Sequence, residues 1–131
     1  MKDTKKKRIL LGKMGLDAHD TGIQIVAKWL SDAGYEVVYG GLYNTPERIC
    51  QTALQEDVDL IGCSFLGGGH LYHTEQLLIQ MKERGIGGIE VIVGGVIPPS
   101  DVTKLKEMGV SLVFTPGTLR EDIIDAVKGI L

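Results

Sequence analysis

Five short apolar runs alternate with five stretches of helical periodicity along the 131 residues of this chain. The runs are nearly continuous in Val, Ile and Leu, a pattern typical of strands that are buried on both faces of a parallel sheet. They span residues 8–12, 35–40, 59–64, 90–95 and 111–114. Because a helix follows every strand without an intervening linker, we predict an α/β fold: a flavodoxin-like (βα)5 domain with a doubly wound parallel sheet.

The predicted helices begin at recognisable capping signals. Thr21 and Gln24 have the spacing of a capping box, and Thr45 before Pro46 predicts an N-cap followed by proline in the first turn. Further helices are expected at about 71–84, 100–109 and 119–131. A chain of this length can bury one core. We therefore predict a single domain over residues 8–131, preceded by a basic lead-in over residues 1–7.

The distribution of charge and apolar residues argues against several classes of partner. Residues 1–8 hold five of the fourteen basic residues, whereas residues 9–131 carry nine basic and sixteen acidic side chains, a net charge of −7. Such an acidic body is a poor surface for binding nucleic acid. No apolar run approaches the length of a membrane span, and no signal peptide is evident. We expect a cytoplasmic protein with no nucleic-acid or membrane partner, and two reduced thiols at Cys50 and Cys63.

The loops that follow the strands differ from those that precede them. Turns into the strands are short, as in "DAGY" and "EMGV", but loops out of the strands are long and rich in glycine, as in "GKMGLDAHDT" and "FLGGGH". Ligands of open α/β sheets bind at the edge where the strands end. These loops also carry apolar side chains, which a ligand or partner is expected to cover. They are Met14, Leu16, Leu42, Phe65, Leu66, Val96 and Ile97.

The first of these loops, "GKMGLDAHDTG" over residues 12–22, does not match the common phosphate-binding motifs. Lys13 is followed by Met14 rather than by Ser or Thr, so the loop is not a P-loop, and GxGxxG is absent. The third strand ends in Ser64, where a phosphate-accepting receiver domain would need an aspartate. Phosphate chemistry therefore does not explain this loop.

The ionisable side chains of these loops suggest metal ligation instead. His70 and His73 could share a helix face with His19 reaching across to form a zinc site, but no HExxH motif is present, and His73 is expected at the surface. Asp17 lies two residues before His19, so it can accept a hydrogen bond from one imidazole nitrogen and leave the other free to bind a metal. Lys13 could pair with Asp17. The alternative is an Asp–His pair that only caps a helix.

Five loop sequences together carry a family resemblance. They are "KMGLDAHDTG", "GLYNTPE", "GCSFLGGGH", "GGVIPPSD" and "PGT". In this order they resemble the cobalamin-binding domain of adenosylcobalamin-dependent acyl-CoA mutases, the methylmalonyl-CoA mutase family. The DxHxxG, SxL and GG motifs of that family fall on residues 17–22, 64–66 and 94–95, and the resemblance covers about residues 8–131.

The resemblance implies a cofactor and the residues that hold it. In that family the histidine of DxHxxG replaces the cofactor's own dimethylbenzimidazole base as the lower cobalt ligand, and the freed nucleotide tail enters a cleft beside the sheet. His19 would then bind the cobalt of adenosylcobalamin in the base-off, His-on form, with Asp17 and Lys13 behind it. Thr21 stands where many relatives have arginine, which leaves the mutase subtype open. The other implied cofactor contacts are Asp20, Gly22, Ser64, Leu66, Gly94, Gly95 and Thr118.

The resemblance also implies a partner. The chain is similar to the separate small subunit of a two-chain mutase, an isomerase whose large (β/α)8-barrel subunit binds the acyl-CoA. The resemblance implies a heterotetramer and a small subunit that is inactive without the large one. Methylmalonyl-CoA, isobutyryl-CoA and 2-hydroxyisobutyryl-CoA are all compatible substrates. Two alternatives stay open at this point: a non-catalytic corrinoid carrier protein of a methyltransferase system, and a small subunit of the glutamate mutase type.

Overall fold

The computed structural model describes residues 6–131, which form strands and helices in strict alternation. The strands are β1 (Arg8–Met14), β2 (Glu36–Asn44), β3 (Leu60–Phe65), β4 (Glu90–Gly95) and β5 (Leu112–Phe114). The helices are α1 (Thr21–Asp32), α2 (Pro46–Glu56), α3 (His70–Glu83), α4 (Pro99–Met108) and α5 (Arg120–Ile130). Residues 1–5 of the predicted basic lead-in lie outside the described residues.

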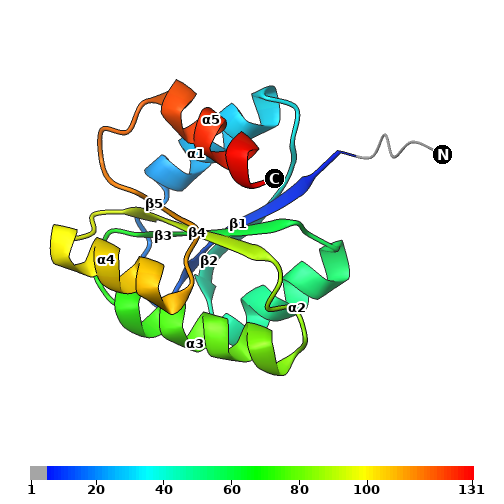
Figure 1. Cartoon of the computed structure of the whole chain (residues 1–131), viewed down its shortest axis with the longest axis vertical. Helices are drawn as coiled ribbons and strands as arrows, with labels where there is room; N and C mark the ends of the chain where they lie inside the picture. Colours follow the sequence, from blue (N-terminus) through cyan, green and yellow to red (C-terminus); the bar gives the residue numbers. More distant parts are fainter. Residues whose placement is uncertain (1–5) are drawn as a thin grey trace.

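The five strands form one parallel sheet in the order β2-β1-β3-β4-β5. Helices α1 and α5 cover one face of this sheet, and α2, α3 and α4 cover the other (Figure 1). The strand order reverses direction between β1 and β3, which is where open α/β sheets bind their ligands. The predicted flavodoxin-like fold is confirmed.

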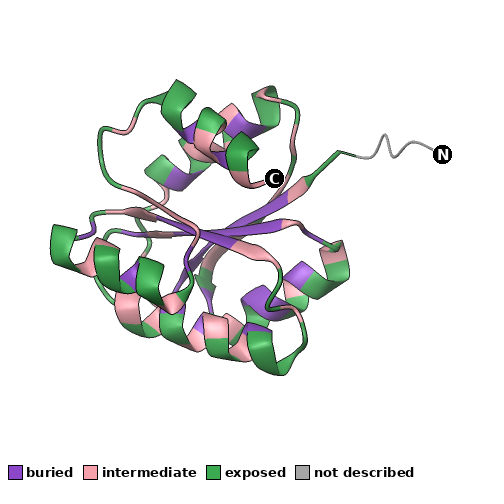
Figure 2. Ribbon diagram, viewed as in Figure 1, coloured by how far each residue is buried: buried purple, intermediate pink, exposed green. Residues whose placement is uncertain are grey.

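An apolar layer lies on each face of the sheet. Side chains alternate between the two faces along a strand, so Leu10 packs in the layer under α2, α3 and α4, and Leu11 packs in the layer under α1 and α5. Figure 2 shows the buried strands between the two helical layers. Cys50 and Cys63 are buried free thiols, and burial raises the pKa of Cys63 to about 12. This thiol is therefore protonated and inert at neutral pH.

Strands β1 and β2 run further than the sequence predicted, to Met14 and Asn44 rather than to residues 12 and 40. The pairing continues through two register shifts, with Gly12 opposite Gly41 and Met14 opposite Asn44. The side-chain amide of Asn44 holds this irregular stretch, because it donates to the carbonyl oxygens of Lys13 at 3.1 Å and Gly41 at 3.0 Å. The segment expected to be a flexible loop from Gly12 onward therefore begins as buried strand.

The helix starts agree with the sequence in one case and differ in another. Thr45 caps α2 as predicted, since its hydroxyl oxygen accepts the backbone N–H of Arg48 at 3.1 Å. The capping box on Thr21 and Gln24 was wrong: Asp20 is the N-cap of α1, and Gln24 Nε2 donates to its carboxylate at 2.7 Å. Among residues 6–131 there is no helix with the length and apolar content needed to cross a bilayer.

Candidate functional site

Lys13 is the first member of a polar group at the carboxyl ends of β1 and β3. Its side chain is fully buried near the end of β1. Its Nζ donates to the carbonyl oxygen of Ser64 at 2.9 Å and lies 3.1 Å from a carboxylate oxygen of Asp17. A buried ammonium is stable only where it is paired and hydrogen-bonded. Lys13 therefore fixes the position of Asp17 relative to the central strands.

Asp17 links the loop after β1 to the loop after β3. Its Oδ2 accepts the backbone N–H groups of Leu66 at 2.6 Å and Gly67 at 2.9 Å, and its side chain is only 6% exposed. Its Oδ1 accepts the backbone N–H of His19 at 3.1 Å. Burial would raise the pKa of Asp17, but the amides of Leu66 and Gly67 and the contacts with His19 outweigh it and hold that pKa well below its usual range. Asp17 is a permanent carboxylate.

His19 presents one ring nitrogen to the protein and the other to solvent. Its Nδ1 lies 2.8 Å from Oδ1 of Asp17, while 70% of its side chain is exposed. A carboxylate can only accept, so Nδ1 carries the proton and the lone pair of the neutral ring is on Nε2. An imidazole oriented by a carboxylate, with its other nitrogen open, is the usual arrangement of a metal-bound histidine. His19 can supply one ligand to a metal that comes from outside the chain.

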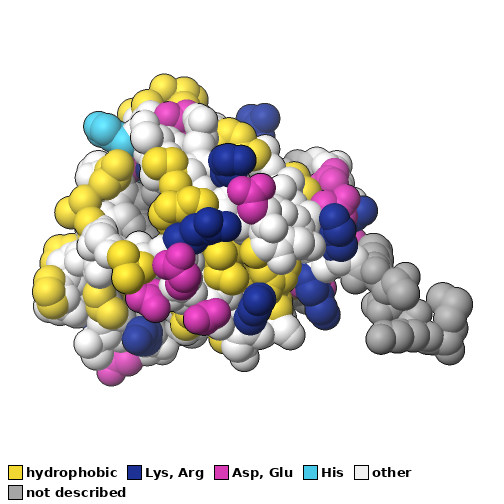
Figure 3. All heavy atoms as spheres, turned by 90° about the horizontal axis from the view of Figure 1, so that it is seen from above, with side chains coloured by type: hydrophobic (Ala, Val, Ile, Leu, Met, Phe, Trp, Pro, Cys, Tyr) yellow, Lys and Arg dark blue, Asp and Glu magenta, His cyan; other side chains and the backbone are white. Residues whose placement is uncertain are grey.

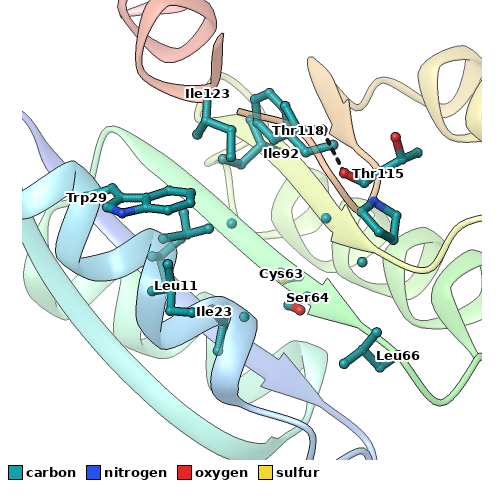
Figure 4. A pocket seen from close by; sticks show the side chains of 18 of the residues that line it. Leu11, Ile23, Trp29, Cys63, Ser64, Leu66, Ile92, Thr115, Thr118 and Ile123 are labelled. Atoms are coloured by element: carbon teal, nitrogen blue, oxygen red, sulfur yellow. Dashed lines mark hydrogen bonds between the residues drawn. The ribbon is translucent and has the colours of Figure 1, made fainter. Parts of the chain in front are cut away.

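An apolar pocket of about 300 Å³ opens beside this group. It lies between α1, α5 and the sheet, and Figure 4 shows side chains from α1, β3 and the loop after β5 around it. The lining is almost entirely apolar. The hydroxyl of Thr118 donates to the carbonyl oxygen of Thr115 at 2.6 Å (Figure 4). Of the residues predicted to hold the cofactor, six line this pocket: Gly22, Ser64, Leu66, Gly94, Gly95 and Thr118. Asp20 is not among the lining residues and is engaged with Gln24.

Of three glycines that line this pocket, the fold itself requires one and does not require the other two. A Cβ on Gly95 would collide with the backbone of Phe65, and φ of Gly95 is +125°, so the fold itself requires glycine there. A Cβ on Gly22 would meet no protein atom within 4 Å, and one on Gly94 would make only ordinary contact, 3.6 Å from the carbonyl oxygen of Phe114. The chain's own packing does not demand glycine at these two positions. The open space suits a ligand that passes close to the backbone.

Six of the seven apolar residues of the strand-end loops fall into two groups, and the seventh, Leu42, is half-buried. Leu16 is 91% exposed, and Leu66 and Val96 are also exposed, as expected for side chains that a ligand or partner covers. Figure 3 shows hydrophobic side chains on both sides of a hollow near the histidine atoms. The expectation was wrong for three other residues, because they belong to the core under α2, α3 and α4. These are Met14, Phe65 and Ile97.

The B12 binding domain family matches residues 7–124. The chain belongs to this family. The family and fold predicted from the sequence are thereby confirmed, and the family supports a cobalamin cofactor.

Relatives of the B12-binding domain include separate subunits and parts of longer mutases. The chain is 43% identical over 124 residues to the 2-hydroxyisobutanoyl-CoA mutase small subunit of Aquincola tertiaricarbonis, covering 95% of this chain and 91% of that protein. It is 40% identical to the pivalyl-CoA mutase small subunit of Xanthobacter autotrophicus, covering 97% and 85%. It is 39% identical to methylmalonyl-CoA mutase of Escherichia coli, covering 97% of this chain but only 17% of that protein.

Solved structures share the fold of the B12-binding domain at low identity. A cobalamin-binding protein from Desulfitobacterium hafniense superposes with a TM-score of 0.83 at 21% identity, covering 97% of this chain and 60% of that one. The chemotaxis protein CheY4 of Vibrio cholerae superposes with a TM-score of 0.73 at 15% identity, covering 97% and 100%. The fold alone therefore does not distinguish a cobalamin protein from a signal receiver.

Sequence reasoning about the B12-binding domain missed two histidine contacts. His70 Nε2 lies 2.7 Å from Oδ2 of Asp101, which ties the start of α3 to the first turn of α4. The prediction of a surface position for His73 was wrong: it is half-buried, its ring is nearly parallel to that of Phe65, and a Cβ on Gly15 would lie 2.8 Å from its Nε2. Among the described residues, no group of three or more His, Cys, Asp or Glu side chains could hold a metal ion.

Proposed function

We propose that this chain is the cobalamin-binding small subunit of an adenosylcobalamin-dependent acyl-CoA mutase, an isomerase, and that it binds its cofactor base-off with His19 on cobalt. One observation carries this proposal. His19 holds Nδ1 against a permanent carboxylate and leaves Nε2 open, directly beside an apolar pocket with unfilled space at Gly22 and Gly94. A cobalt corrinoid with a long aromatic tail needs both a free nitrogen for the cobalt and an apolar pocket for the tail.

The residues of the chain act by holding and orienting this group. When bound, adenosylcobalamin supplies the radical chemistry of a 1,2-carbon-skeleton rearrangement. Asp17 fixes the tautomer and direction of the His19 ring, and Lys13 fixes Asp17 from the buried side. Gly22, Ser64, Leu66, Gly94, Gly95 and Thr118 line the space for the nucleotide tail.

The exposed apolar edge supports a second protein as partner. Leu16, Leu66 and Val96 stand around the candidate cobalt site, and a patch of this kind usually marks an interface. The relatives named as small subunits favour a large catalytic subunit as this partner. We propose a (β/α)8-barrel partner that binds the acyl-CoA, in a heterotetramer, with methylmalonyl-CoA, isobutyryl-CoA or 2-hydroxyisobutyryl-CoA as the class of substrate, and a cytoplasmic location.

A corrinoid carrier of a methyltransferase system is the less favoured function. The monomethylamine corrinoid protein of Methanosarcina barkeri has the same fold, with a TM-score of 0.78, but only 16% identity and 58% of its length covered. The two small subunits match at 40% or more over most of their own length. That difference favours the mutase subunit over the corrinoid carrier. Because both relatives are named as acyl-CoA mutase subunits, they also favour this function over a subunit of the glutamate mutase type.

Electron paramagnetic resonance of the cob(II)alamin complex tests the ligand assignment. An axial nitrogen ligand splits the cobalt lines into triplets, which become doublets if that nitrogen is ¹⁵N. We expect this change when the chain is labelled with ¹⁵N-histidine, and loss of the protein-derived splitting in His19→Ala. His70→Gln is the matched control, since His70 directs Nε2 to Asp101 and keeps Nδ1 buried. If the triplets stay triplets in the chain labelled with ¹⁵N-histidine, the assignment is refuted.

A further inference from the structure

The only tryptophan of the chain, Trp29, lines the pocket described above. It lies seven residues after Gly22 on α1, or about 10 Å along the helix axis at 1.5 Å per residue. In Figure 4 its indole extends from α1 into the pocket on the side opposite Leu66, which follows the carboxyl end of β3. Trp29 therefore stands at the end of the pocket remote from His19 and the strand ends.

The surroundings of Trp29 are apolar. Leu11 of β1, Ile92 of β4 and Ile123 of α5 line the same part of the pocket and belong to one core layer, and Trp29 is half-buried against this layer. The hydroxyl-bearing lining residues, by contrast, lie near the strand ends, as Ser64 does at the end of β3. A ligand that fills the whole pocket would place its polar part toward the strand ends and an apolar, flat part against the indole.

We infer that Trp29 is the end wall of the pocket and sets the length of the aromatic base that the cofactor's nucleotide tail can carry. The inference rests on the proposed function, because it takes the nucleotide tail as the occupant. The indole offers a large rigid surface to a benzimidazole, and aromatic rings attract one another beyond their buried area. The same rigidity would stop a longer ring system, because the buried side of the indole packs against the core layer.

Three corrinoids distinguish this role. Adenosylcobalamin carries dimethylbenzimidazole, a second cobamide carries the longer naphthimidazole, and adenosylcobinamide has no nucleotide tail. For the natural chain we expect dissociation constants about tenfold lower for adenosylcobalamin than for the naphthimidazole form, the discrimination that one or two extra carbon atoms give in an apolar pocket. In Trp29→Ala this preference disappears or reverses, while the affinity for adenosylcobinamide stays the same.

Reversal of the preference distinguishes a role of Trp29 in selecting the base from a general loss of structure in the variant, since a damaged fold does not bind a larger ligand more tightly. Tyr39→Ala is the matched control: Tyr39 is an exposed aromatic residue on β2 and does not line the pocket. It should leave all three affinities unchanged. An unchanged ratio between the two bases in Trp29→Ala overturns the inference, even if both affinities fall.

A second measurement needs no variant. Because Trp29 is the only tryptophan, the chain labelled with 5-fluorotryptophan gives one ¹⁹F resonance, which we expect to shift with adenosylcobalamin and to stay in place with adenosylcobinamide. No shift with bound adenosylcobalamin contradicts the role of Trp29 alone. Absence of any corrinoid binding contradicts the proposed function instead, so the two failures are distinguishable.

Discussion

The pair formed by Lys13 and Asp17 allows a quantitative prediction of stability. Both side chains are buried, but they depend on one another to different degrees. Asp17 accepts three N–H groups besides its contacts with Lys13 and the His19 ring, whereas Lys13 has only Asp17 and the carbonyl oxygen of Ser64 among its described contacts. Removal of the carboxylate therefore leaves a buried ammonium with the Ser64 carbonyl oxygen as its one remaining described partner. Removal of the ammonium leaves a carboxylate that still accepts three N–H groups.

The expected free energies follow from this asymmetry. Asp17→Asn should lower the free energy of unfolding by about 3–5 kcal/mol, the cost of a buried ion that has lost its partner. Lys13→Met keeps the buried aliphatic volume and should cost about 2 kcal/mol, the range for a hydrogen bond to a charged group. In the double variant no ammonium is left unpaired. We expect it to be more stable than Asp17→Asn alone, because a coupling energy of about 3 kcal/mol between the two sites exceeds the cost of Lys13→Met.

Urea unfolding followed by circular dichroism measures these differences. A domain of this size is stable by about 5–15 kcal/mol in all, so Asp17→Asn could be unfolded without urea. Recovery of folding in the double variant then carries the test. Lys28→Met is the control, because Lys28 pairs with Asp32 at 3.5 Å on the exposed face of α1 and should change stability by less than about 0.5 kcal/mol. Additive effects of the two buried substitutions would refute the reasoning.

Three further predictions concern pH, the pocket and the partner. Because the folded pKa of Asp17 is depressed, its stabilising effect is complete above the unfolded value of about 3.9 and is lost as pH falls below it, so the stability gap to Asp17→Asn should narrow between pH 5 and pH 3 in urea titrations. Gly22→Leu should weaken adenosylcobalamin binding at least about tenfold without lowering the melting temperature. The control Gly129→Leu, at an exposed helical glycine outside the pocket, should leave binding unchanged. Equal affinities of the two variants would show that the nucleotide tail does not pass close to Gly22. Leu16→Glu should weaken association with the large subunit in analytical ultracentrifugation more than it weakens cobalamin binding, and Leu54→Glu, exposed on α2, should affect neither. Association that survives Leu16→Glu would place the partner elsewhere.

The sequence was sufficient for the fold and for the central part of the candidate site. The five apolar runs are buried on both faces, so their composition alone marks them as strands of a parallel sheet. The pairing of Asp17 with His19 could also be predicted, because two residues on one loop are close whatever the rest of the chain does. The contact of Lys13 with Asp17 was expected, but the burial of Lys13 was not. The sequence predicted that Lys13 belongs to a loop, whereas it lies near the end of strand β1.

The contacts that sequence reasoning missed connect residues far apart in the chain. The amides of Leu66 and Gly67 reach Asp17 from about fifty residues away, and no local pattern shows that two backbone N–H groups will point at one carboxylate. Phe65 was expected at the surface because it lies next to a glycine-rich loop, but it is the last residue of β3 and faces the core. Trp29 belongs to the apolar face of α1, and periodicity alone does not show that a pocket opens on that face.

The isolation of the His19 imidazole has a consequence for metal contamination. Copper and zinc ions bind protein sites tightly when several side chains surround them. In residues 6–131 no such set exists, and the carboxylate nearest to His19 is already occupied by N–H donors and an ammonium. A stray ion would therefore meet a single nitrogen and dissociate again. In the complex proposed above, the cobalt ion would arrive with its four equatorial nitrogens and its upper ligand already in place. It would lack only the one ligand that His19 offers, so the exposed histidine would favour this cofactor over simple metal ions.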